Sequence, residues 1–258
     1  MFNKILIANR GEIAVRIIRA ARELGVATVA VYSEADRDAL HVALADEAIC
    51  IGPARATESY LKMNNILEAA VATGAQAIHP GFGFLSENSK FARLCEEMNI
   101  KFIGPSAQVM DMMGDKINAR AEMVKAGVPV TPGSEGEVYT SEEALDLANK
   151  IGYPVMLKAS AGGGGKGIRK VSNAEELVPA FEAATAEAKA AFGNGAMFIE
   201  RMIFPARHIE VQILADQKGN VIHLGDRDCS LQRNNQKVLE ESPSVAIGHT
   251  LRERISQA

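Results

Sequence analysis

Hydrophobic residues in the first hundred positions alternate between short apolar runs and longer segments with helical spacing. The runs that predict buried strands are Lys4–Asn9, Ala27–Ser33, Glu47–Gly52, Gln76–Gly81 and Lys101–Pro105. Amphipathic helices are expected directly after the first strand, around Leu61–Ala72 and around Asn88–Met98. Strands that alternate with helices of this length predict an α/β fold with a parallel, doubly wound sheet.

The pattern changes after a predicted helix over about Ala107–Lys125. Two prolines and three glycines within Gly127–Gly136 indicate a domain boundary. The order of elements beyond it is αββαβ. These elements are helix Ser141–Ile151, strand Pro154–Ala159, strand Ile168–Ser172, helix Ala174–Ala191 and strand Ala196–Ile203.

The last part of the chain is predicted to hold two strands and the start of a helix. The strands are His208–Asp216 and Asn220–Gln232, with a hairpin turn at Asp216–Asn220, and the helix begins near His249. This is too little to bury both faces of a sheet. We therefore expect the front part of a longer protein. The alternative is that these strands extend a neighbouring sheet.

Composition and charge exclude several classes of protein. The 258 residues carry a net charge of -4, which gives no global reason to expect nucleic acid or membrane binding. No apolar run reaches the roughly 18 residues that span a bilayer, and the N-terminus does not resemble a signal peptide. The three cysteines, Cys50, Cys95 and Cys229, form no C-x-x-C pair, which favours a reducing, cytoplasmic setting.

Four consecutive glycines lie between two lysines in KASAGGGGKGIRKV, Lys158–Val171. A Walker A loop would need Ser or Thr after Lys166 and then a helix, but Gly167 and a strand-like segment follow. The protein-kinase loop is excluded as well, because its spacing and partner motifs are absent. We predict a flap between two antiparallel strands that closes over phosphates with its N–H groups. A floppy hairpin loop is the structural alternative.

Lys158 ends a strand whose other residues are apolar, so its ammonium group needs a partner. That partner is either a nucleotide phosphate or a carboxylate elsewhere in the chain. Ile199–Ile203 is a candidate hinge along an adenine edge, with Glu200 beside it. NAD binding is not expected, because Asn9–Ala14 has one glycine in place of G-x-G-x-x-G, although Glu34 and Asp36 end the second strand, where a ribose-binding acid would lie.

Two further segments suit a ligand site. HPGFGFLSEN, His79–Asn88, follows a strand end, where α/β sheets bind ligands; a tight turn with a packed aromatic is the alternative. DRDCSLQRNNQK, Asp226–Lys237, is dense in polar side chains and is either the wall of a site or a solvated loop. Cys229 is interpreted as a core thiol, because it has no adjacent histidine or second cysteine.

Eight segments together resemble the biotin carboxylases, which are ATP-grasp enzymes. They are ILIANRGEIAVRIIRAARELG, IHPGFGFLSEN, FIGPS, MGDKINAR, AGVPVTPGS, GYPVMLKASAGGGGKGIRKV, ARHIEVQILAD and RDCSLQRNNQKVLEE. They follow the family's order through all 258 residues. Members are either subunits of bacterial acetyl-CoA carboxylase or the N-terminal part of larger biotin-dependent carboxylases. The start of the chain favours the standalone bacterial subunit.

The resemblance implies ATP-dependent carboxylation of biotin, the first half-reaction of acetyl-CoA carboxylase in fatty-acid synthesis. ATP would phosphorylate bicarbonate to carboxyphosphate, and the resulting CO2 would carboxylate biotin on a biotin carboxyl carrier protein. The implied cofactors are ATP, Mg²⁺ (or Mn²⁺) and biotin. The implied partners are the carrier protein, carboxyltransferase subunits and a second copy of the chain, with Arg19 and Glu23 as candidates for the dimer surface.

Transferred residue by residue, the resemblance implies an ATP site in the second half of the chain. The lysines Lys116 and Lys158 would hold phosphates beneath the glycine loop, Glu200 and its neighbours would line the adenine pocket, and His208 would meet the ribose. The complete implied set is Lys116, Lys158, Gly162, Gly163, Gly164, Gly165, Lys166, Glu200, Arg201, Met202, Ile203, His208, Gln232 and Asn235.

The resemblance also implies sites for bicarbonate and biotin. Lys237 would be the catalytic residue, an electrostatic clamp on the bicarbonate anion. Phe82 and Gly83 would lie beside the ureido group of biotin. The family prefers Tyr at Phe82, so this chain keeps the ring without the hydroxyl. Asn235 replaces a histidine found in many members, and its amide can still donate and accept hydrogen bonds.

No metal ligand is predicted within the chain. The family's Mg²⁺ ligands, two glutamates and an asparagine, and its catalytic arginine are expected beyond Ala258. Glu240 and Glu241 are adjacent and in a predicted loop, so a metal role is not expected for them. Because phosphoryl transfer depends on Mg²⁺, a chain that ends at Ala258 is not expected to turn over alone.

In the family's terms, the chain is predicted to have four parts. Residues 1–112 would form the pre-ATP-grasp N-terminal domain, 113–130 a connecting helix, 131–203 the ATP-grasp lid subdomain and 204–258 the truncated start of the second ATP-grasp subdomain.

Two other functions are compatible with a nucleotide-binding chain. One is an ATP-grasp ligase that joins a carboxylate to an amine, and the other is a non-catalytic nucleotide-binding module.

Overall fold

The computed structural model describes residues 1–114, 116–160, 167–216, 218–233 and 236–258, without the side chains of residues 116 and 117. The chain divides into two compact units, Met1–Ala119 and Arg120–Ala258. The finer division expected from the sequence stays a prediction. Within the described ranges, no helix is both long and apolar enough to cross a membrane.

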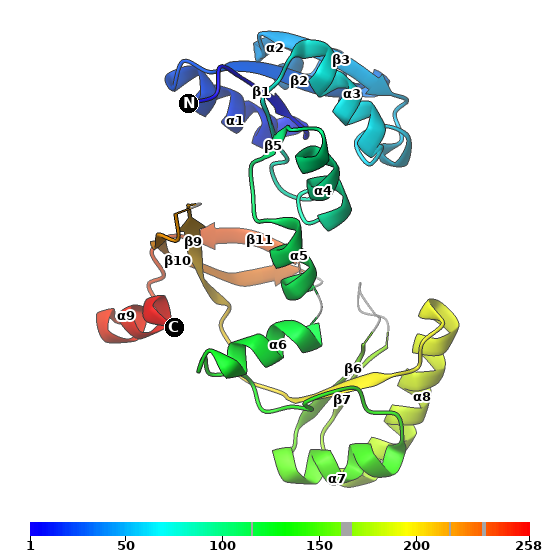
Figure 1. Cartoon of the computed structure of the whole chain (residues 1–258). Helices are drawn as coiled ribbons and strands as arrows, with labels where there is room; N and C mark the ends of the chain where they lie inside the picture. The colour runs from blue at the N-terminus through cyan, green and yellow to red at the C-terminus, as the bar shows by residue number, and fades with distance from the viewer. Residues whose placement is uncertain (115, 161–166, 217, 234–235) are drawn as a thin grey trace. The chain divides into compact units, whose positions relative to one another are not determined.

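The first unit is built around a five-stranded parallel sheet in the order β3-β2-β1-β4-β5 (Figure 1). Its strands are β1 (Lys4–Ile7), β2 (Ala27–Ser33), β3 (Glu47–Gly52), β4 (Ala77–His79) and β5 (Lys101–Phe102). Its helices are α1 (Gly11–Glu23), α2 (Leu40–Leu44), α3 (Met63–Thr73), α4 (Ser89–Glu97) and α5 (Ala107–Gly114), with short 3-10 turns at Glu34–Asp36 and Ala56–Glu58. The predicted parallel sheet is confirmed.

The two faces of this sheet are buried against different helices. Ile5 and Ile7 pack with Ile17 and Ile18 of α1, whereas Leu6 belongs to a core shared with α3 and α4. Successive side chains of a strand point to opposite faces, so β1 has to be apolar along its whole length. Burial on both faces makes the sheet doubly wound, as predicted.

The strand order reverses between β1 and β4. The chain continues from β1 to β2 and β3 on one side, while β4 and β5 lie on the other. Open α/β sheets bind ligands outside the carboxyl ends of the strands at such a point. The segments that leave these two ends begin at Ala8 and Pro80.

The first sheet of the second unit is antiparallel, in the order β7-β6-β8, and carries the glycine loop. Its strands are β6 (Val155–Ala159), β7 (Ile168–Val171) and β8 (Met197–Arg201). Helices α7 (Ser141–Ile151) and α8 (Ala174–Phe192) pack on one face, where Val155 and Leu157 are fully buried (Figure 1). The side chains of Met156 and Lys158 alternate with them and are half-buried.

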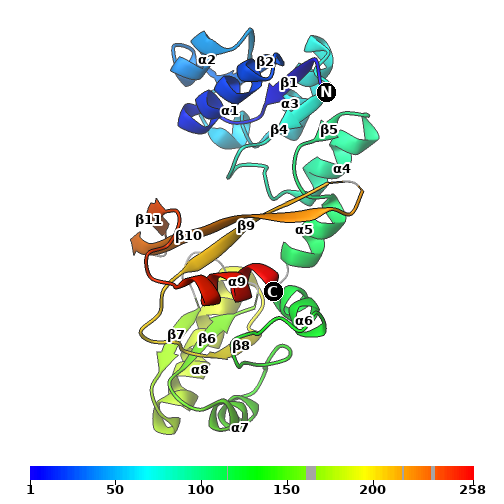
Figure 2. The same ribbon diagram turned by 90° about the vertical axis from the view of Figure 1, so that its left-hand side faces the viewer.

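The second sheet of this unit has three antiparallel strands in the order β11-β10-β9. They are β9 (Ile209–Ala215), β10 (Val221–Arg233) and β11 (Gln236–Glu241), and helix α9 (His249–Gln257) follows (Figure 2). The predicted turn between β9 and β10 is confirmed, because the Asp216 carboxylate accepts hydrogen bonds from the backbone N–H groups of Lys218 and Asn220.

One sequence prediction in the second unit is wrong. The segment around Glu240 is not a loop, because Gln236–Glu241 forms β11 and makes a third strand. Both faces of this strand are exposed, so its sequence lacks the alternation that marks a half-buried strand. The helix expected over Ala107–Lys125 is confirmed on both sides of residue 115, as α5 (Ala107–Gly114) and α6 (Lys116–Lys125).

Candidate functional site

Lys158 and Glu200 form an ion pair across the first sheet of the second unit. They come from neighbouring strands, β6 and β8, and both project from the face opposite the one that packs on α7 and α8. Their side chains remain 33% and 25% exposed, so a ligand can reach the pair. The sequence left a phosphate or a carboxylate as the partner of Lys158, and the chain itself supplies the carboxylate. Both groups belong to the predicted ATP set.

The glycine loop connects two strands that are antiparallel neighbours, as predicted. Lys158 of β6 lies opposite Ile168 of β7, and the Ala159 N–H donates to the Gly167 carbonyl at 3.0 Å. Gly167 has a φ of 67°, and an added Cβ would lie 2.7 Å from the Ala159 methyl group, so the end of the loop needs glycine. Gly162–Gly165 and Lys166 lie outside the described residues.

The candidate hinge after β8 is fixed by backbone hydrogen bonds to other parts of the unit. The Arg201 N–H donates to the Pro132 carbonyl at 2.7 Å, and the Met202 N–H donates to the Pro154 carbonyl at 2.9 Å. Beyond these bonds, the Ile203 side chain is 54% exposed. An apolar side chain held at the end of a fixed strand is suited to contact a flat ring such as adenine.

A carboxylate that the sequence analysis missed, Glu210 of β9, organises the second sheet. Its Oε2 lies 2.5 Å from the Lys237 ammonium of β11 and 3.5 Å from His208 Nε2. Its Oε1 accepts a hydrogen bond from Arg227 Nε of β10 at 2.9 Å. Three cationic or titratable side chains from around one sheet therefore converge on a single carboxylate.

Charge and hydrogen bonding fix the protonation states in this cluster. The hydrogen bond from Lys237, followed by the bond and the charge of Arg227, lowers the pKa of Glu210 from 4.5 to about 2, although partial burial opposes this. The hydrogen bond to Glu210 in turn raises the pKa of Lys237 above its usual 10.5. Lys237 is therefore a fixed positive charge at neutral pH, while 37% of its side chain stays exposed.

His208 and Gln232, both predicted ATP contacts, lie beside one another. Gln232 Nε2 is 3.1 Å from His208 Nδ1 and donates to the Cys229 carbonyl at 2.9 Å. The backbone N–H of His208 donates to Ser230 Oγ at 3.0 Å. The Ser230 hydroxyl in turn donates to the Asp228 carboxylate at 2.6 Å. The structure thus brings together three predicted residues, Gln232 and Lys237 on the second sheet and His208 immediately before β9.

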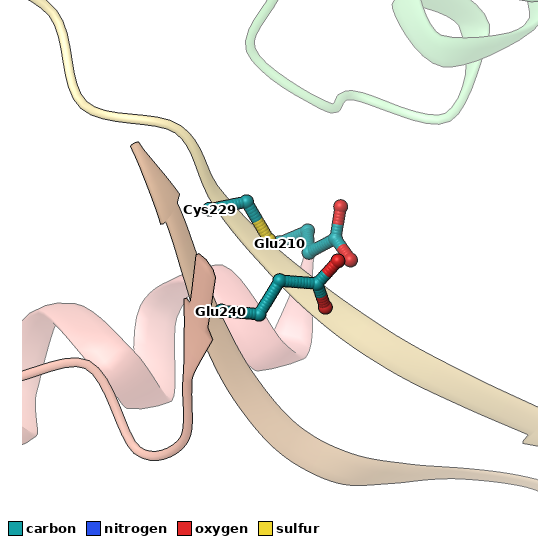
Figure 3. A group of neighbouring side chains, drawn as sticks. All are labelled: Glu210, Cys229 and Glu240. Atoms are coloured by element: carbon teal, nitrogen blue, oxygen red, sulfur yellow. The ribbon is translucent and has the colours of Figure 1, made fainter. Parts of the chain in front are cut away.

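Among the described residues, one group has the geometry to hold a metal ion: Glu210, Cys229 and Glu240 (Figure 3). Their side chains come from β9, β10 and β11, and their ligand atoms lie within 4.8 Å of one another. The chemistry does not fit Mg²⁺, which prefers oxygen ligands. Glu210 is already neutralised by Lys237 and Arg227, and burial raises the pKa of the Cys229 thiol.

The candidate biotin residues Phe82 and Gly83 lie in the first unit, in the segment that follows β4. The Phe82 side chain is 61% exposed. Gly83 has a φ of 67°, and a Cβ added there would meet nothing within 4 Å, so the backbone is approachable. The turn therefore presents an exposed ring and an open backbone at the carboxyl end of β4, where α/β sheets bind ligands.

For two other predicted site residues, the structure describes no side chain. Lys116 is the first residue of α6, and its side chain lies outside the described part of the chain. Asn235 lies outside the described residues altogether. The roles assigned to them rest on the sequence.

Two family models match the chain, one for each half. The first is "Biotin carboxylase, N-terminal domain", over residues 1–110. The second is "Carbamoyl-phosphate synthase L chain, ATP binding domain", over residues 115–258. The sequence of domains thus agrees with the resemblance seen in the motifs.

Known proteins resemble the chain over its whole length. A biotin carboxylase from Nostoc sp. is 60% identical over 257 residues, which is 58% of that protein. A biotin carboxylase–beta-gamma-ATP complex from Campylobacter jejuni superimposes with a TM-score of 0.91 and 52% identity, covering all of this chain and 58% of that one.

A third relative is the biotin carboxylase domain dimer of a 2-oxoglutarate carboxylase from Hydrogenobacter thermophilus, with a TM-score of 0.88 and 53% identity. That structure is described as a complex with MgADP, ADP and bicarbonate, and the chain covers 56% of it. The chain therefore spans little more than half the length of the relatives that it matches.

Proposed function

The chain belongs to the biotin carboxylase family, and on that premise we propose that the protein carrying it uses ATP and bicarbonate to carboxylate biotin. The observation that carries this proposal is the position of Lys237. Glu210 holds its ammonium group at 2.5 Å and keeps it charged. A fixed cation of this kind can orient bicarbonate and stabilise the negative charge that develops as it attacks a phosphoryl group.

ATP would bind on the second unit, through the residues named in the sequence analysis. Phosphate oxygens would compete with Glu200 for Lys158, whose position on strand β6 is fixed. Glu200 and the exposed Ile203 would line the base and ribose side, Lys116 would hold phosphates together with Lys158, and Gly162–Gly165 with Lys166 would close over them. The related Campylobacter jejuni structure, a complex with beta-gamma-ATP, supports nucleotide binding by this fold.

His208, Gln232 and Asn235 are proposed to contact the nucleotide beside the bicarbonate site. His208 and Gln232 fix one another at 3.1 Å, which limits the rotamers that either side chain can adopt. Phe82 and Gly83 are proposed to face the ureido group of biotin. Mg²⁺ would neutralise charge on the phosphates when bound. The described cluster around Glu210 does not suit that ion, so we assign it no Mg²⁺ role.

The proposal extends to the final carboxyl acceptor. We favour acetyl-CoA, with a biotin carboxyl carrier protein and carboxyltransferase subunits as partners in the cytoplasm. The relative from Hydrogenobacter thermophilus belongs to a 2-oxoglutarate carboxylase, so the same domain can serve another acceptor. A homodimer is proposed as well, with Arg19 and Glu23 exposed on α1 as candidate contacts.

The proposal is tested with the intact protein from which this chain comes. ADP release should require bicarbonate and rise when free biotin is added, and amino acids should not replace either one. Lys237→Ala should reduce the biotin-dependent rate about 100-fold. Lys218→Ala, in the exposed turn between β9 and β10, should stay within about twofold of wild type.

The same assay separates the alternatives. A carboxylate–amine ligase would release ADP with an amine acceptor in the absence of biotin. A nucleotide-binding module would bind ATP without bicarbonate-dependent hydrolysis. Either result in the intact protein would contradict the proposed function.

A further inference from the structure

The turn that carries Phe82 and Gly83 is held by side chains from the neighbouring strand end. We infer that Asn9 and Arg10, together with Tyr60, position this turn for its ligand. The role rests on the proposed function, in which the turn faces the ureido group of biotin. Asn9 and Arg10 follow β1 and the turn follows β4, so both lie where the strand order reverses.

Asn9 connects the end of β1 to the turn through hydrogen bonds of its side chain. Its side-chain amide donates one hydrogen bond to the Pro80 carbonyl and another to the Phe82 carbonyl, both at 2.7 Å. Its Oδ1 accepts from the Arg10 N–H at 2.8 Å, and the residue is only 4% exposed. The amide therefore uses both of its ends, and no isosteric residue can replace all three bonds.

The turn is shaped to receive this amide. A Cβ added at Gly81 would lie 2.8 Å from Asn9 Nδ2, so a side chain there would displace the donor. Gly81 and Gly83 have φ values of 64° and 67°, and Phe84 has a φ of 43°. A left-handed phenylalanine is unusual and persists only where the surroundings fix it.

The surroundings of Phe84 are Tyr60 and Arg10. The Phe84 and Tyr60 rings are stacked, with centroids 5.0 Å apart and an interplanar angle of 12°. The Arg10 guanidinium lies 5.3 Å from the Tyr60 centroid and 5.7 Å from that of Phe84. A planar cation over both rings adds an electrostatic attraction to the stacking.

Tyr60 is itself immobilised. It is fully buried, its hydroxyl donates to Asp36 Oδ2 at 2.7 Å, and it accepts a hydrogen bond from the Ser33 N–H at 2.9 Å. Asp36 also pairs with Arg10 at 3.2 Å, so the acid that occupies the position of a Rossmann ribose ligand is engaged in this network. The network fixes both the ring that stacks on Phe84 and the guanidinium that contacts the two rings.

These contacts leave the ligand-facing part of the turn open. The Phe82 ring is 61% exposed and the backbone at Gly83 is unobstructed, while the carbonyl of Phe82 and the ring of Phe84 are held from behind. A site that is held in its bound conformation before the ligand arrives loses less entropy on binding. Loosening the turn should therefore weaken biotin binding more than ATP binding.

The test uses the intact protein with the variants Asn9→Ala and Arg10→Ala. The matched control is Asn65→Ala, because Asn65 also donates from its side chain to a backbone carbonyl, that of Ile51 at 2.7 Å, in the same unit. In the ADP-release assay, Asn9→Ala should raise the KM for free biotin about tenfold and leave the KM for ATP nearly unchanged. Hydrogen exchange of a peptide covering residues 80–88 should be faster in both test variants than in the control.

Arg10→Ala should shift the biotin KM in the same direction, and because Arg10 is exposed it decides the question if Asn9→Ala does not fold. A wild-type biotin KM in the variants, or equal shifts for ATP and biotin, would overturn the inference while the proposed function stands. A wild-type protein that ignores biotin would overturn the proposed function, and the ligand assigned here with it.

Discussion

At the scale of single residues, the candidate site depends on Glu210 more than on any residue that the sequence singled out. Lys237 and His208 were predicted from the resemblance, but their common partner was not. The sequence does contain a pattern that points to Glu210 as this partner. His208, Glu210 and Gln212 alternate along a predicted strand, so their side chains lie on the same face. What the sequence could not give is the register, which places Arg227 opposite Glu210.

The depressed pKa of Glu210 predicts acid sensitivity. Its pKa is about 2 in the folded chain against an ordinary 4.5, so the folded state favours the ionised form. The resulting stability is complete above pH 4.5 and is lost as the pH falls towards 2. A shift of this size corresponds to at most about 3 kcal/mol, which solvent screening reduces.

Urea unfolding at pH 6 and pH 3 tests this expectation. Wild type should lose more unfolding free energy over that interval than Glu210→Gln, which has no charge to lose. Glu182→Gln, on an exposed position of α8, should follow wild type. Equal losses in wild type and Glu210→Gln would show that the carboxylate is not stabilised by its cations.

At the scale of helices and strands, most elements were predictable, and the failures have physical causes. Strands buried on both faces, such as β2, and helices with capping residues, such as α7 with Thr140 as its N-cap, were predicted with their correct bounds. β11 was missed because it has no buried face. Alternation reports burial, so it cannot reveal a strand that is exposed on both sides.

The lid hairpin gives a prediction at this scale, because its two lysines have different supports. Lys158 is anchored on strand β6, and Lys166 belongs to the connecting loop. Lys158→Ala should weaken ATP binding at least tenfold, since it removes a charged contact and leaves Glu200 unpaired near the phosphates. Lys166→Ala should mainly slow turnover. Calorimetric titration with ATP, paired with the turnover assay, would expose equal or negligible effects, which would contradict a phosphate lid.

The contact between α9 and the second sheet gives a second prediction about the elements, because the Arg252 side chain of α9 forms it. Its Nε donates to the buried Asp226 carboxylate at 2.6 Å, and its Nη2 donates to the Ser244 carbonyl at 2.7 Å. Arg252→Leu leaves a charge in the core without this partner and should destabilise the second unit by about 3 kcal/mol. Arg254→Leu, on an exposed position of the same helix, should change stability by less than about 0.5 kcal/mol in chemical denaturation. Similar losses for both would contradict the role given to Arg252.

At the scale of the whole molecule, the second sheet of the second unit is the least covered part. Eight of its apolar side chains are at least half exposed: Ile213, Leu214, Val221, Ile222, Leu224, Leu231, Val238 and Leu239. This chain covers 58% of the length of its Nostoc relative, and exposed apolar faces of this extent are usually covered. For this reason every activity test above uses the intact protein.

In the proposed function, the intact protein transfers a carboxyl group from bicarbonate to biotin. The most direct measurement is the transfer of isotopic carbon from labelled bicarbonate to biotin in the presence of ATP. We expect acid-labile label on biotin that requires ATP and falls about 100-fold in Lys237→Ala, with Lys218→Ala close to wild type. Labelled biotin at an undiminished rate in Lys237→Ala, or no label on biotin in the wild-type protein, would contradict it.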